Sequence, residues 1–179
     1  MKNFCMAVLA CLVLTAPVAA TVLVPVDLAE LAHDATVIAR GQVVAVDGRW
    51  TDDRRGIETV ITLEPEAMLK GQAGGVVQFR VPGGTLGRYR NIVIGAPQFA
   101  IGQRLIVFLG ATGPEVPHLL GLSQGVYRIG TGAGGAALVV PSPVMPGVTG
   151  PVVRGVSSRQ AAPLADFERD VRALARAER

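Results

Sequence analysis

Between residues 36 and 140, short runs of β-branched and other apolar residues alternate with glycine, proline and polar turn residues. The chain holds 22 glycines and 12 prolines without a collagen-like period, and half of its residues are hydrophobic, so it is neither fibrous nor disordered. Strand patterns do not alternate regularly with helix patterns in this region. Short strands separated by turn signals are typical of an antiparallel barrel or sandwich, so we predict a mainly β domain over residues 21–140.

The predicted strands are separated by turns of different kinds. Gly41 lies inside the first run and predicts a bulge or a sharp bend there. The polar residues 47–56 predict a hairpin tip, and residues 85–101, which are spaced by glycine and proline, predict an irregular segment. The strands are expected at residues 36–46, 57–69, 76–81, 104–109, 119–120, 126–129 and 136–140, the fourth of them buried.

One helix is predicted before the β domain and one after it. Residues 27–35 begin with Asp27 as a capping residue, and Glu30 follows three residues later, as in a capping box. Residues 164–179 carry a C-terminal amphipathic helix, because their apolar residues are spaced by three and four. Residues 141–163 contain five prolines and predict a linker or loop. The C-terminal helix is expected either to plug the open end of a barrel or to dock on a partner.

The first 20 residues have the layout of a secretory signal peptide. Lys2 precedes an uncharged apolar run from Phe4 to Leu14, and small residues then lead to a predicted cleavage after Ala20. The run is shorter than the ~20 residues that cross a bilayer, which disfavours an uncleaved anchor. We therefore predict export to the periplasm or the medium, without stable membrane insertion. A lipid anchor on Cys11 is the alternative.

Few residues are available for metal or thiol chemistry. The chain has two cysteines and two histidines, and the predicted cleavage removes both Cys5 and Cys11. The histidines, His33 and His118, are far apart in the sequence. We therefore expect no metal, no cofactor and no disulfide. The basic residues are mostly scattered arginines with few aromatic neighbours, so we do not expect a nucleic-acid surface.

Two glycine-rich motifs imitate catalytic ones. Residues 121–125 match G-x-S-x-G around Ser123, but a strand pattern follows and no histidine comes after His118, so the residue order of an α/β-hydrolase is missing. Residues 130–135 match G-x-G-x-x-G, but a strand pattern follows where a dinucleotide site needs a helix. Both motifs are interpreted as turns. Glu64 and Glu66, two apart on one predicted strand, are a further candidate for acid–base chemistry.

Six segments carry a resemblance when they are taken in order: residues 27–43, 66–71, 81–84, 95–99, 102–109 and 121–125. Their arrangement resembles a group of uncharacterised exported bacterial proteins and is more distantly similar to the OB-like barrel of tissue metalloproteinase inhibitors and netrin modules. The resemblance implies an antiparallel OB-like barrel and makes a protease a candidate partner. Those inhibitors chelate the protease zinc with an N-terminal cysteine, whereas the predicted cleavage exposes Thr21, so no inhibitory residue is carried over.

We predict a non-enzymatic binding module whose partner is a protein, with an exported protease as one candidate. Recognition usually lies in loops on a rigid scaffold, and two loops here gather aromatic and basic residues. The alternatives are a small hydrolase that uses Ser123 or the Glu64 and Glu66 pair, and a structural component of the envelope. The sequence leaves the oligomeric state open. The predicted binding residues are Arg49, Trp50, Arg54, Arg55, Arg88, Tyr89 and Arg90.

Overall fold

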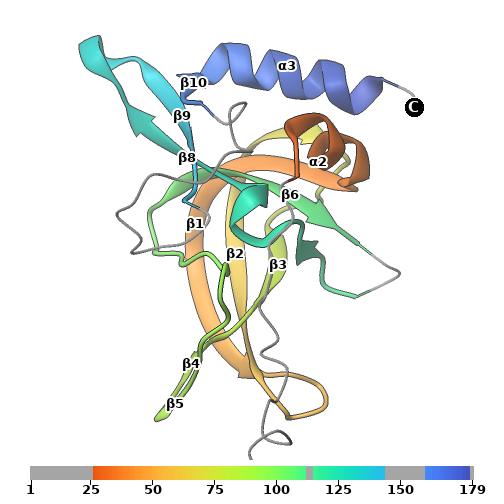
Figure 1. The fold of residues 1–179 in the computed structure, drawn as a ribbon, viewed down its shortest axis with the longest axis vertical. Coiled ribbons are helices and arrows are strands. Elements are labelled where there is room, and N and C mark those ends of the chain that lie inside the picture. Colours follow the sequence, from red (N-terminus) through yellow and green to blue (C-terminus); the bar gives the residue numbers. More distant parts are fainter. Residues whose placement is uncertain (1–25, 112–114, 144–159, 178–179) are drawn as a thin grey trace, which may run out of the picture.

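The fold is seen in a computed structural model, which describes residues 26–111, 115–143 and 160–177. The predicted signal peptide and most of the predicted linker lie outside these residues. The described chain forms an eight-stranded sheet, a two-stranded sheet and two α-helices (Figure 1), which confirms a mainly β fold with a helix before it and a helix after it. The helices are α2 (Leu28–Asp34) and α3 (Leu164–Arg176); the strands are β1 (Val37–Trp50), β2 (Ile57–Lys70), β3 (Val77–Pro82), β4 (Gly84–Leu86), β5 (Tyr89–Asn91), β6 (Arg104–Gly110), β7 (His118–Leu119), β8 (Val126–Thr131), β9 (Ala137–Pro141) and β10 (Ala162–Pro163).

The large sheet is organised by β1, which has partners on both of its edges. β1 pairs antiparallel with β2 along nearly its whole length and with β6 over residues 37–42. β3 pairs antiparallel with β2, and it meets β7 in a parallel contact between Arg80 and His118. β7 and β8 both pair with β6, and β9 and β10 extend the sheet beyond β8.

The bend predicted at Gly41 is present. The register between β1 and β2 shifts between Arg40 and Gly41, and β1 is strongly curved (Figure 1). A Cβ atom at Gly41 would lie 2.2 Å from the carbonyl oxygen of Glu64, so the two backbones approach each other too closely for any side chain there. Glycine at this position therefore allows one strand to pair with two neighbours while it bends.

Two clusters of buried side chains lie on opposite faces of β6, because alternate residues of a strand point to opposite faces. Leu105, Val107 and Leu109 face the first cluster, which also contains Phe79. Ile106 and Phe108 face the second cluster, which also contains residues of α2 and α3. Burial on both faces confirms the prediction of a buried strand at residues 104–109, apart from the exposed Arg104.

The two helices pack on the second cluster. The carboxylate of Asp27 caps α2 by accepting a hydrogen bond from the backbone nitrogen of Glu30 at 2.7 Å, as the sequence predicts. Phe167 and Val171 of α3 are buried, and the ring centroid of Phe167 lies 4.6 Å from that of Tyr127. Figure 1 shows both helices at one end of the molecule, and the β4–β5 hairpin at the other. We call these the helical end and the tip end.

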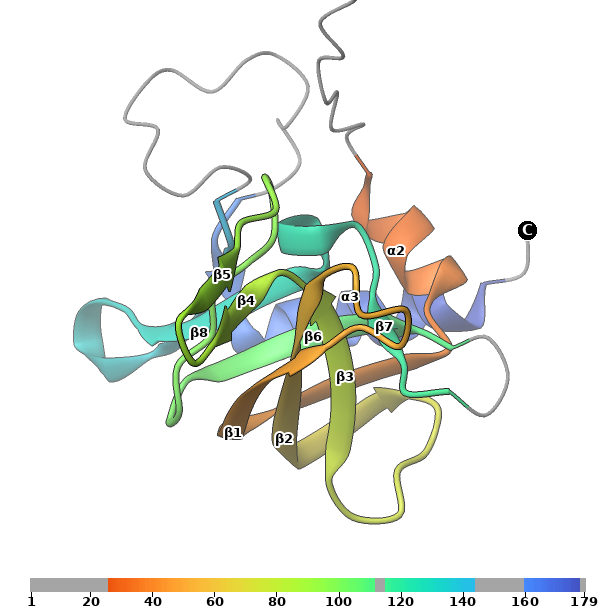
Figure 2. The same ribbon diagram turned by 90° about the horizontal axis from the view of Figure 1, so that it is seen from below.

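Three short elements differ from the prediction. Residues 85–101, expected to be irregular, contain part of the β4–β5 hairpin, which forms a two-stranded sheet of its own and is seen from below in Figure 2. Residues 162 and 163, expected to be in a linker, form β10, where Ala162 pairs with Val139 of β9. The hairpin tip expected at 47–56 is shorter, because β1 continues to Trp50. No helix among the described residues is long and apolar enough to span a membrane.

Candidate functional site

Two aromatic side chains meet on the surface of the tip end. Trp50, at the end of β1, and Tyr89, at the start of β5, have ring centroids 5.4 Å apart. Arg88 lies with its guanidinium carbon 5.1 Å from the centroid of the Tyr89 ring and donates a hydrogen bond to the Tyr89 hydroxyl at 2.9 Å. The two aromatic residues are 41% and 47% exposed. We call Trp50, Arg88 and Tyr89 the aromatic tip.

Two glycines allow the hairpin that carries Tyr89 to lie close to β1 and β2. A Cβ atom at Gly48 would lie 2.1 Å from the carbonyl oxygen of Thr85, and one at Gly84 would lie 2.2 Å from the hydroxyl of Thr59. Gly84 also has a φ of 141°, which side-chain-bearing residues rarely adopt. The glycines thus allow β4 to lie against the long strands, and this contact positions Tyr89 beside Trp50.

The other predicted arginines of the β1–β2 tip differ in their surroundings. Arg49 donates a hydrogen bond to the buried carboxylate of Glu58 at 2.7 Å, directly across the strand pair, so it serves the sheet. Arg54 and Arg55 are exposed and have no carboxylate partner among the residues that the structure describes. Asp53 accepts hydrogen bonds from the Thr51 hydroxyl and the Arg55 backbone nitrogen, and these bonds lower the pKa of the Asp53 carboxyl. The turn is therefore held by its own hydrogen bonds, and two arginines remain available to a partner.

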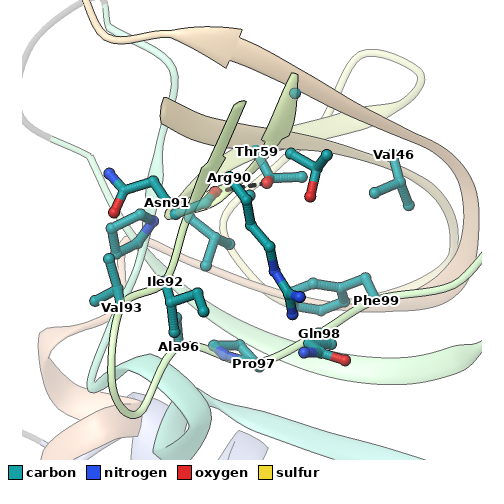
Figure 3. Close-up of a pocket in the computed structure, with 16 residues that line it drawn as sticks. Val46, Thr59, Arg90, Asn91, Ile92, Val93, Ala96, Pro97, Gln98 and Phe99 are labelled. Atoms are coloured by element: carbon teal, nitrogen blue, oxygen red, sulfur yellow. Dashed lines mark hydrogen bonds between the residues drawn. The ribbon is translucent and has the colours of Figure 1, made fainter. Parts of the chain in front are cut away.

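A cavity of about 470 Å³ lies behind the aromatic tip, between β1, β3, the β4–β5 hairpin and the β5–β6 loop (Figure 3). Val46, Ala96 and Phe99, which are partly buried, form its apolar floor, and Val81 is almost completely buried beneath it; all four belong to or pack against the first core cluster. The Phe99 ring stands edge-on to Phe79 with centroids 5.6 Å apart, which fixes that part of the floor. The volume is within the range of about 300–1,000 Å³ that is usual for ligand pockets.

The cavity mouth is lined by polar side chains. Arg90 extends across it toward Phe99 and Gln98 (Figure 3). Thr59 donates a hydrogen bond to the carbonyl oxygen of Gly83 at 2.7 Å, which ties the β3–β4 connection to β2. The structure therefore separates Arg90 from the aromatic tip: this predicted binding residue is exposed, but it lies at the mouth of the cavity.

Exposed isoleucines continue this surface along the β5–β6 loop. Ile92 and Ile94 are 72% and 65% exposed, and Ile92 also lines the cavity. Backbone hydrogen bonds hold the loop, since the nitrogen of Ser123 donates to the carbonyl oxygen of Gly95 at 3.1 Å. Large apolar residues that are gathered on a surface, next to arginines and aromatic rings, are typical of interaction sites.

Ser123 is not placed as a nucleophile. It lies in a short 3-10 helix, η1 (Leu122–Gly125), and its side chain is completely buried. A nucleophile elbow needs a strand, a sharp turn that exposes the serine and then an α-helix, whereas β8 follows η1 here. The motif at 121–125 is therefore a tight turn that anchors the β5–β6 loop.

The two glutamates of β2 have different surroundings. Arg104 donates two hydrogen bonds to the Glu66 carboxylate, at 2.7 and 2.6 Å, and the Arg40 side-chain nitrogen Nε lies 3.2 Å from it. The bonds from Arg104 hold the pKa of the Glu66 carboxyl below its usual value. Arg40 also contacts Glu168 of α3, so these charges connect the sheet to the helix. Glu66 is thus an ionised structural group, while Glu64 faces solvent.

Sequence reasoning missed the cavity and its floor. Phe99 and Ala96 lie in a segment without strand periodicity, and their burial depends on contacts with distant strands. The Pro82-Gly83-Gly84 sequence was the available signal, because two consecutive glycines after a strand permit an unusual backbone path. Comparison with protein-family models, curated proteins and solved structures finds no match to this chain.

Proposed function

We propose that the chain is an exported, non-enzymatic binding module that captures a protein partner with its aromatic tip. The observation that carries the proposal is the half-exposed contact of Trp50 with Tyr89, next to Arg88. Tryptophan, tyrosine and arginine are the residue types that dominate interface hot spots. Ile92 and Ile94 add apolar area beside them.

We infer that the scaffold is an OB-like barrel. The pairings β1–β2, β2–β3, β3–β7, β7–β6 and β6–β1 connect five strands in a ring, with a parallel contact between β3 and β7. A five-stranded, partly open barrel of this kind uses its connecting loops for binding. The resemblance of the sequence to netrin modules and tissue metalloproteinase inhibitors also supports this inference.

The charge of the tip end favours a partner with an acidic surface. Arg54, Arg55 and Arg88 have no carboxylate partner among the described residues; Asp52 and Asp53 lie in the same turn as Arg54 and Arg55, and Asp47 is exposed on β1. Arginines of this kind steer association with acidic proteins and form bidentate bonds with their carboxylates. An exported protease as the partner is supported by the sequence resemblance alone.

Affinity capture from the exported fraction tests the proposal. The tagged wild-type protein is compared with Trp50→Ala and Arg88→Ala, which remove the two ends of the aromatic tip. Val140→Ala and Arg169→Ala are matched controls, because both residues are exposed and lie on β9 and α3. We expect a protein that the wild type and the controls retain and that both tip variants lose. Equal recovery with all five proteins contradicts the proposal.

The hydrolase alternative has less support. Ser123 is buried and Glu66 is held by Arg104, so neither group is presented to a substrate. Labelling by a fluorophosphonate probe that disappears in Ser123→Ala would restore the alternative.

A further inference from the structure

The cavity behind the aromatic tip combines an apolar floor with a cation at its mouth. Val46, Ala96 and Phe99 provide the floor, and they pack against the core of the domain. Arg90 is the one charged residue among the described residues that line the cavity. The exposed Arg90 also has no carboxylate partner among them. A molecule in the cavity would therefore contact apolar side chains at the floor and a guanidinium at the mouth.

The other polar residues that line the cavity are neutral, and Arg128, outside the lining, donates a hydrogen bond to the backbone carbonyl oxygen of Gln98 at 2.8 Å. Thr59 already donates its hydroxyl to Gly83, and Gln98 lines the mouth, whereas the amide of Asn91 points away from the Arg90 side chain (Figure 3) and its nitrogen lies beside Gly56. Neutral amide donors can add hydrogen bonds to an anion but do not add charge. One guanidinium with neutral neighbours matches an anion of a single charge, and its planar geometry matches a carboxylate.

The backbone at the β3–β4 connection, which lines the cavity, is already paired. The nitrogen of Gly83 donates to the carbonyl oxygen of Ile57 at 2.8 Å, and Gly84 is paired with Asn91 across the β4–β5 hairpin. A peptide that binds by adding a strand needs an unpaired strand edge. Gly83 and Gly84 therefore offer no strand edge, although β5 pairs only with β4, and the cavity volume of about 470 Å³ is suited to a compact molecule.

We propose that this cavity binds a small monocarboxylate with an apolar body. The carboxylate pairs with the Arg90 guanidinium at the mouth, and the apolar body lies on Val46, Ala96 and Phe99. A neutral apolar molecule would leave Arg90 without a partner, and a small inorganic anion would leave the floor uncovered. Both halves of the site are therefore needed for tight binding.

Calorimetric titration with decanoate tests this site. The full-length gene is expressed so that the cell processes the chain as usual, and the purified protein is titrated with decanoate, decanol and acetate. We expect decanoate to bind, decanol to bind about ten- to a hundredfold more weakly because it cannot form the charged pair, and acetate not to bind measurably. Equal affinity for decanoate and decanol, or no binding of decanoate, overturns the proposal.

Two variants locate the binding. Arg90→Gln is expected to weaken decanoate binding about ten- to a hundredfold and to leave decanol unchanged, while Arg169→Gln on the exposed face of α3 is the matched control. Ala96→Leu places a larger side chain on the floor and is expected to weaken both ligands. Equal decanoate affinity in Arg90→Gln and Arg169→Gln contradicts the assignment.

The C-terminus of a polypeptide also combines a carboxylate with an apolar side chain. A short peptide that ends in leucine tests this second kind of ligand. Binding of the peptide with a free terminal carboxylate, without binding of decanoate, contradicts a small carboxylate as the occupant. Decanoate binding and partner capture are measured separately, and Trp50 and Arg88 do not line the cavity. Either proposal can therefore fail without the other.

Discussion

At the helical end, Phe108, Tyr127 and Phe167 form a chain of ring contacts and are almost completely buried, whereas at the tip end Trp50 and Tyr89 are nearly half exposed. Both ends contain aromatic pairs at similar ring distances, but only the rings at the helical end are covered by helices. Exposed aromatic area contributes less to folding and remains available for binding. The difference teaches that the helical end stabilises the fold, while the tip end presents a surface.

The largest expected difference is in the free energy of unfolding. Phe108→Ala leaves a cavity between the sheet and the helices, so we expect it to lower the free energy of unfolding by about 3–5 kcal/mol. Trp50→Ala removes a half-exposed ring, and we expect a loss below about 1.5 kcal/mol. Urea unfolding of both variants measures the two losses. Similar losses would break the distinction between the two ends.

Two glycines with almost the same predicted clash sharpen the comparison. Gly41→Ala places its Cβ against the carbonyl oxygen of Glu64, and Gly41 lies where β1 is paired on both sides, so we expect a loss of about 1–3 kcal/mol. Gly48→Ala meets Thr85 of a three-residue strand that pairs only with β5, and the hairpin can shift to relieve the contact. We therefore expect a smaller loss for Gly48→Ala, below about 1 kcal/mol.

Thermal unfolding of both glycine variants tests this difference, with Gly74→Ala as the control because a Cβ at Gly74 meets nothing within 4 Å. Gly48→Ala is also expected to reduce partner capture, because the hairpin carries Tyr89. A greater loss of stability in Gly48→Ala than in Gly41→Ala would show that the hairpin is rigid.

The smallest expected effect is a pH dependence. Because hydrogen bonds from Arg104 lower the pKa of Glu66 in the folded state, the stabilisation is present above the unfolded pKa of about 4.3 and is lost as the pH falls through the folded value. We expect the melting temperature of the wild type to exceed that of Glu66→Gln above pH ~5, and the two to converge toward pH ~3. Asp53→Asn at the exposed turn is expected to show a smaller difference. A difference in melting temperature between the wild type and Glu66→Gln that does not change with pH would contradict a stabilising ion pair between Glu66 and Arg104.

Local patterns predicted much of the fold. The cap at Asp27, the strand at residues 104–109 and the bend at Gly41 depend on short sequence signals, and each is present. The β4–β5 hairpin was missed because three-residue strands have no measurable periodicity and its position depends on Gly48, far away in the sequence.

The candidate site was predicted in part for similar reasons. Two loops rich in aromatic and basic residues suggested that Trp50 and Tyr89 belong to one surface, and the structure brings them together. The place of Arg90 in a cavity, and the pairing of Glu66 with Arg104 across 38 residues, follow from long-range contacts that no local pattern contains.

Photo-crosslinking in the cell tests most directly whether the tip end is a binding surface. A photo-crosslinking phenylalanine derivative replaces Tyr89 in one protein and the exposed Val140 of β9 in another. We predict a discrete crosslinked species from position 89 and none from position 140. No crosslink at position 89, or the same species from both positions, would contradict the proposal that the aromatic tip captures a partner.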